Sequence, residues 1–67
     1  MNDEYLIRAT DAIPERMVLV NIASKRAREL ARGSAPLVKT QPGEGYLDIA
    51  LHEIAAKKIV IDNSDRD

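Results

Sequence analysis

The chain contains no cysteine, phenylalanine or tryptophan, and Tyr5 and Tyr46 are its only tyrosines. Without cysteine there can be neither a disulfide nor a thiolate metal site, which are common stabilising devices in small domains. A domain of 67 residues is only marginally stable without such devices. Because 45% of the residues are hydrophobic, we expect a protein partner to cover some of them and to supply the missing stability.

Strong charge and long hydrophobic runs are absent as well. The formal net charge of −1 argues against a protein held on nucleic acid by bulk electrostatics. The longest apolar run, Met17–Val20, is far too short to span a bilayer. The first residues, Met1–Leu6, are acidic where a secretory signal peptide is basic. These features predict a soluble, cytoplasmic protein.

Residues suited to catalysis are sparse. His52 is the only histidine, and its place on a predicted helix is typical of a solvated surface side chain rather than a general base. Ser24 has no surrounding motif that would activate it as a nucleophile. Gly43 and Gly45 lack the lysine and the helix that follow a phosphate-binding loop. We therefore expect no catalytic residue, no cofactor and no metal site.

The spacing of apolar residues predicts a small all-α fold with two principal helices and a short helix before them. The short helix spans residues 3–12 and carries acidic residues at its positive N-terminal end. The second begins with Pro14 in its first turn and runs to about Arg32, where Gly33 supplies the C-terminal cap. The third spans residues 47–58, in which apolar residues recur at helical spacing.

The segments outside the helices are also predictable. Residues 34–46 form a long loop with a turn at Pro42-Gly43, and the apolar stretch 35–38 within it is expected to lie extended against the helices. The β-branched residues 59–61 favour a short strand or an extended arm. The sequence thus predicts one domain over residues 1–61 and a polar, disordered tail over 62–67.

The middle helix has more apolar surface than one buried face accounts for. At ~100° per residue, one arc gathers the residues expected in the core: Leu19, Val20, Ala23, Ala27, Leu30 and Ala31. Met17, Val18 and Ile22 fall outside that arc, toward water. On the third helix Ile49 likewise lies opposite the apolar stripe. We expect another protein to cover these positions.

The basic residues of the middle helix have two interpretations. Lys25, Arg28 and Arg32 share one face, which is either simply solvated or directed at nucleic acid. A helix-turn-helix is disfavoured, because the loop at 34–46 is too long and side chains suited to base contacts are not clustered there. Arg26 lies at the rim of the apolar arc, where it either extends to solvent or, as we favour, pairs with an acid on a partner.

The residues of this helix resemble the signature helix of the omega subunit family of bacterial RNA polymerase. That family begins the helix with Asn-Arg-aromatic and continues with Leu-Val-x-x-Ala-x-Arg-Ala-Arg-x-Leu. Residues 15–33 here read ERMVLVNIASKRARELARG. A second block follows in the family's order, with APLV at 35–38 and IALHEI at 49–54, where bacterial members usually read ALREI. The ending AAKKIVI at 55–61 is similar to the related archaeal and eukaryotic small subunits.

The resemblance implies a non-catalytic subunit of an enzyme complex, the DNA-directed RNA polymerase. Family members bind the large β′ subunit, aid its folding and promote assembly of a core of α, β, β′ and omega, so contact with DNA is indirect and no membrane is involved. Stray apolar positions and the family match together give the candidate partner-binding residues: Met17, Val18, Ile22, Arg26, Ala27, Leu30, Ile49, Ala50, Leu51, Glu53 and Ile54.

The chain departs from the family at several positions. Some members bind guanosine tetraphosphate with a Met-Ala-Arg-Val start, but Asp3 and Glu4 would repel that anion here, so this site is not carried over. His52 stands where arginine is usual. The alternative functions are a small helical DNA-binding regulator and an antitoxin-type protein that binds a single partner.

Overall fold

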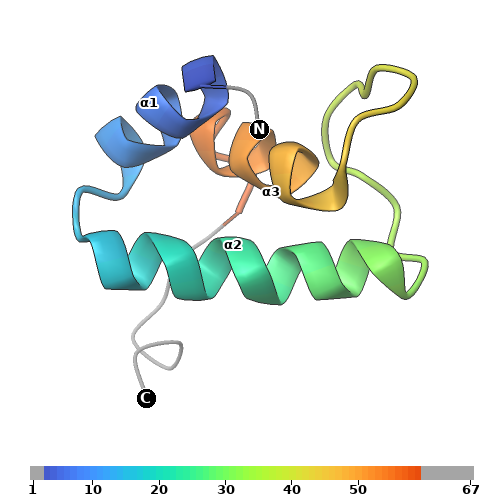
Figure 1. Ribbon diagram of the computed structural model, residues 1–67, viewed down its shortest axis with the longest axis horizontal. Helices are drawn as coiled ribbons and strands as arrows, with labels where there is room; N and C mark the ends of the chain where they lie inside the picture. Colours follow the sequence, from blue (N-terminus) through green and yellow to red (C-terminus); the bar gives the residue numbers. More distant parts are fainter. Residues whose placement is uncertain (1–2, 60–67) are drawn as a thin grey trace.

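The computed structural model describes residues 3–59, which form three helices and no strand. They are α1 (Asp3–Ala12), α2 (Arg16–Ala31) and α3 (Tyr46–Ala55). Helix α3 packs against both other helices, whereas α1 lies mainly along α3 and touches α2 little (Figure 1). The predicted all-α fold is confirmed. None of the helices within residues 3–59 is long and apolar enough to cross a membrane.

The junction between α1 and α2 is longer than the sequence suggested. Helix α2 begins at Arg16 rather than at Pro14, and Glu15 is its N-cap. The Glu15 carboxylate accepts a hydrogen bond from the backbone N–H of Met17 at 3.1 Å, which satisfies one of the free donors at the start of the helix. Ile13 follows α1 directly and is buried, so the three-residue link is anchored in the core.

Helix α2 ends as predicted, with a glycine in a left-handed conformation. Gly33 has φ +111°, and its N–H donates to the carbonyl of Leu30 at 3.1 Å. The N–H of Ser34 donates to the carbonyl of Glu29, also at 3.1 Å. This pair of bonds defines a Schellman motif and satisfies two carbonyls that the helix leaves open.

Helix α3 ends in the same way without a glycine. Its last residue is Ala55, three residues before the predicted end at Lys58. The N–H groups of Lys57 and Lys58 donate to the carbonyls of Ile54 and Glu53 at 3.0 and 2.9 Å. Lys57 adopts the left-handed conformation with φ +59°, which a residue with a Cβ enters only at some cost.

The loop between α2 and α3 contains the predicted turn. The N–H of Glu44 donates to the carbonyl of Gln41 at 3.2 Å, and the positive φ of Gly43 makes this a type II turn with Pro42 at its second position. The Glu44 carboxylate accepts a hydrogen bond from the N–H of Gln41 at 2.7 Å. Earlier in the loop, the apolar stretch 35–38 was expected to lie against the helices, but only Val38 packs there, and residues 35–37 are exposed.

Two hydrophobic clusters make up the interior. The larger joins α1, the N-terminal half of α2 and the C-terminal half of α3, and its buried members are Ala9, Ile13, Leu19, Ile22, Ala23, Leu51 and Ile54. The smaller joins the other halves of α2 and α3 beneath the loop, and its buried members are Leu30, Ile49 and Ala50.

These clusters correct several burial predictions. Ile22 and Ile49 were expected to face outward, yet both are buried. Val20 and Ala31 were expected in the core, yet both are exposed. Ile59 lies in a bend and packs on the larger cluster. The rest of the predicted strand or arm at 59–61, and the predicted tail at 62–67, lie outside the described residues.

Candidate protein-interaction surface

A buried ion pair connects α2 to α3. The guanidinium of Arg26 donates to both carboxylate oxygens of Glu53, from Nε to Oε1 at 2.5 Å and from Nη2 to Oε2 at 3.2 Å. The Glu53 side chain is completely buried, and that of Arg26 is 15% exposed. A two-point contact of this kind fixes both the distance and the orientation of the two helices.

The same two side chains also hold the loop. The N–H of Leu37 donates to Glu53 Oε2 at 2.8 Å, and Arg26 Nη2 donates to the carbonyl of Ala35 at 3.1 Å. Arg26 Nη1 reaches Glu29 on its own helix at 3.3 Å. The buried carboxylate therefore accepts three hydrogen bonds, which offset the cost of removing it from water.

The electrostatics of this cluster favour the charged state of the arginine. The hydrogen bond to Glu53 is the main reason why the pKa of Arg26 is raised, and burial opposes it only in part. The raised pKa favours the protonated guanidinium further, in a side chain that is always charged in proteins. We expected Arg26 to pair with an acid on a partner, and that prediction is wrong, because its acid is Glu53 of the same chain.

The ion pair explains why the sequence-based burial pattern was displaced. The buried face of α2 is centred near Arg26 rather than on the alanine-rich arc, a rotation of roughly 60° at 100° per residue. The buried face of α3 is rotated by roughly 70° toward Glu53 on the same basis. Because each charge satisfies the other, each helix includes a charged residue in its buried face.

The candidate partner-binding residues occupy three kinds of position. Seven are buried inside the chain: Ile22, Leu30, Ile49, Ala50, Leu51, Glu53 and Ile54. Val18, Arg26 and Ala27 are half-buried, and Met17 is 64% exposed. In this structure most of them form the interior, and Met17 has the largest surface for a partner. The predicted basic face is exposed, with Lys25, Arg28 and Arg32 on it.

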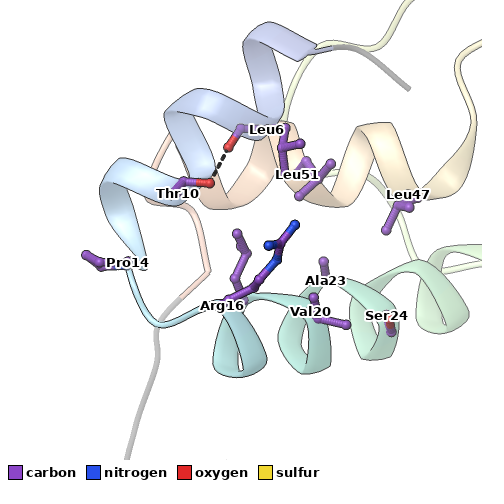
Figure 2. Close-up of a pocket in the computed structure, with 10 residues that line it drawn as sticks. Leu6, Thr10, Pro14, Arg16, Val20, Ala23, Ser24, Leu47 and Leu51 are labelled. Atoms are coloured by element: carbon purple, nitrogen blue, oxygen red, sulfur yellow. Dashed lines mark hydrogen bonds between the residues drawn. The ribbon is translucent and has the colours of Figure 1, made fainter.

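The apolar surface that the fold leaves open lies elsewhere. Val20 on α2 and Leu47 on α3 are 48% and 38% exposed, and both line an apolar groove between the helices. Figure 2 shows their side chains on α2 and α3, on opposite sides of this groove, and the buried Leu51 and Ala23 also line it. The spacing of apolar residues did not predict this surface, because it placed Val20 in the core.

Comparison with known proteins identifies the family. The family model described as RNA polymerase Rpb6 matches residues 8–61, which include most of α1 and all of α2 and α3. The chain belongs to this family of RNA polymerase subunits.

Several relatives of this family member carry the name DNA-directed RNA polymerase subunit omega. The protein of Campylobacter lari is 49% identical over 49 residues, which are 72% of this chain and 68% of the relative. That of Desulfatibacillum aliphaticivorans is 38% identical over 78% of this chain and 75% of its own length. That of Heliobacterium modesticaldum is 37% identical over 88% of this chain and 86% of its own length. No solved structure gives a significant match.

One side chain of this family member has an unexpected environment. His52, predicted to be a solvated surface residue, stacks on Tyr5 with the ring centroids 4.4 Å apart and the planes 9° from parallel. Its Nδ1 is buried and has no hydrogen-bond partner among residues 3–59. The stack ties α1 to α3. Partial burial of Tyr5 and the nearby carboxylate of Glu44, in that order, raise the pKa of its hydroxyl.

Proposed function

We propose that this chain is the omega-type subunit of a DNA-directed RNA polymerase. In this role it binds the β′ subunit, assists its folding and promotes assembly of a core of α, β, β′ and omega. The observation that carries the proposal is the match of most of the chain to proteins that bear the omega name, at identities from 37 to 49%. The subunit acts in the cytoplasm and meets DNA only through the complex.

The surface of the chain supports a binding role. Met17, Val20 and Leu47 expose apolar side chains on neighbouring helices. A small domain gains stability when a partner that binds only the folded form covers such residues. We propose Met17 as a partner contact, and the buried candidates as the framework that holds the contact surface in shape.

Co-purification tests the proposal directly. A tagged copy expressed in its own host is expected to recover β′ together with α and β in defined proportion. An unrelated helical protein of similar size, carrying the same tag, is the control. Recovery of a single small protein in place of the polymerase subunits would favour the antitoxin alternative. A shift of duplex DNA at physiological salt by the chain alone would favour the DNA-binding regulator.

A refolding assay tests the assembly role separately. Denatured β′ is renatured with α and β in the presence or absence of the chain, and the yield of active core is measured. We expect a higher yield when the chain is present. Equal yields across a range of chain concentrations would refute the folding role, even if the chain binds the finished enzyme.

A further inference from the structure

Helix α1 is packed onto the rest of the fold less firmly than the other two helices are. Its only buried residue is Ala9, whose small side chain removes little apolar area from water. Tyr5, Leu6 and Ala12 pack on the larger cluster but are only half-buried. Helices α2 and α3 bury four and five residues, among them leucines and isoleucines. Of the three helices, α1 therefore gains the least stability from packing.

The sequence of α1 also favours a helix only weakly. Its ten residues are fewer than an isolated helix needs to be stable in water. Asp11 stands in the last turn, at the negative end of the helix dipole, and no basic residue of the helix accompanies it there. The Thr10 hydroxyl donates to the carbonyl of Leu6 at 2.8 Å, a bond that slightly destabilises helices. The ion pair of Arg8 with Glu4 is exposed on both sides and offsets little of this.

Several contacts that join α2 to α3 form without α1. Arg26 and Glu53 bind each other, and both also hold the loop. The smaller cluster likewise consists of residues from α2, α3 and the loop. Helix α1 lies along α3, where Tyr5 stacks on His52, and it touches α2 little (Figure 1). Separation of α1 from α3 therefore leaves the ion pair, the smaller cluster and the loop in place.

We propose that α1 is a lid over α3, which opens as a unit while α2, α3 and the loop between them stay folded. The link at residues 13–15 is the hinge, because Ile13 is buried and Glu15 caps α2, so both hold its far end. Opening uncovers Leu51 and Ile54, which share a cluster with Ala9 and are 2% and 3% exposed when the lid is closed. The open state is a minor population that is reached at lower cost than global unfolding. A ligand that binds the uncovered face shifts the chain toward the open state.

Because the chain lacks cysteine, an introduced thiol reports the opening of one site in the full chain. Ala9 in the larger cluster and Ala50 in the smaller are both 0% exposed, so Ala9→Cys and Ala50→Cys place single thiols at matched burial. An excess of iodoacetamide modifies each thiol only when its site opens. We expect Ala9→Cys to react at least about tenfold faster than Ala50→Cys. Its rate is also expected to depend less steeply on urea, because the opening of one helix exposes less surface than global unfolding does.

A second substitution separates a lid from global unfolding. Leu6→Ala weakens the packing of α1 and is expected to raise the reaction rate of Ala9→Cys about tenfold, and that of Ala50→Cys less than about threefold. Amide hydrogen exchange of the unsubstituted chain repeats the comparison without introduced thiols. The hydrogen-bonded amides of α1 are expected to exchange at least about tenfold faster than those of α3.

The opposite outcomes are equally definite. If the two thiols react at equal rates with equal dependence on urea, or if Leu6→Ala raises both rates equally, the chain opens only as a whole and α1 is not a lid. Faster reaction of Ala50→Cys, or equal hydrogen exchange in α1 and α3, would overturn the proposal as well. These measurements need no polymerase, so their result does not depend on the proposed function.

Discussion

The two halves of α2 are covered in different ways. The C-terminal half is closed by directional contacts, since Arg26 and Glu53 bind each other and together hold the loop at Ala35 and Leu37. The N-terminal half is covered by apolar packing alone, and the cover is incomplete, because Val20 lies in an open groove. The C-terminal half is therefore fixed by directional contacts within the chain, whereas the N-terminal half carries part of the larger hydrophobic cluster and still leaves apolar surface open.

The largest expected effect concerns the closed half. Glu53→Gln replaces an acceptor of three hydrogen bonds by an amide whose NH₂ group faces donors, and it leaves the Arg26 charge without its buried acid, with only the more exposed Glu29 beside it. Breaking a buried pair from one side costs about 3–5 kcal/mol. For a domain of this size such a loss is enough to unfold the free chain. Urea unfolding followed by circular dichroism measures it.

Two further variants serve as controls for Glu53→Gln. Arg28→Ala removes an exposed charge of the same helix and is expected to change the free energy of unfolding by no more than about 0.5 kcal/mol. The double variant Arg26→Met with Glu53→Leu, which removes both charges, is expected to be more stable than Glu53→Gln. A small loss with Glu53→Gln, comparable to that with Arg28→Ala, would mean that the two halves of α2 do not differ in the way described.

The second prediction compares two aliphatic residues of α2 that the sequence assigned to the wrong sides. Ile22→Ala empties a buried position and is expected to cost about 2–4 kcal/mol. Val20→Ala removes a half-exposed side chain and is expected to change the free energy of unfolding by less than about 1 kcal/mol. The denaturant midpoints of the two variants measure whether these losses differ as expected. Equal losses in the free energy of unfolding would show that Val20 is buried like Ile22, and that the groove beside it is closed.

The sequence allowed the helices to be predicted well and the buried faces poorly. Turn residues and caps are local, so Gly33 and the Pro42-Gly43 turn were predictable from their neighbours alone. The direction in which a helix faces depends on contacts distant in sequence. Counting apolar residues treated Arg26 as a boundary of the buried face, whereas a buried acid on α3 makes it the centre.

A signal for this pairing was nevertheless present in the sequence. On the wheel of α3, Glu53 lies between Ile49 and Ala50, so a charged residue interrupts an otherwise apolar face. Almost no acid is buried without a partner. A basic residue on the rim of the neighbouring helix then becomes the natural candidate. Such a rule identifies the Arg26–Glu53 pair, but the open groove depends on the resulting rotation of the helices and requires the structure.

The third prediction contrasts the ends of α2 and α3. Gly33→Ala forces a Cβ into a left-handed conformation and is expected to destabilise the chain by about 1 kcal/mol, although no atom obstructs the added carbon. Lys57→Gly relieves the same strain after α3 and is expected to stabilise by up to about 1 kcal/mol. Thermal melts measure both. The two substitutions must change the melting temperature in opposite directions. A lower melting temperature for Lys57→Gly would contradict backbone strain at that position.

The smallest expected effect concerns Tyr5, which joins α1 to α3 beside the apolar half. Its pKa is raised in the folded chain, so folding favours the neutral hydroxyl. That contribution is fully present below the unfolded pKa of about 10 and is lost as the pH rises through the higher folded value. Urea midpoints measured from pH 8 upward are expected to fall less steeply for Tyr5→Phe than for the unsubstituted chain. Because Glu44 contributes to the shift, Glu44→Gln is expected to lower the pKa of Tyr5 in an ultraviolet titration. Identical alkaline decline in Tyr5→Phe and the unsubstituted chain would show that α1 is held without this hydroxyl.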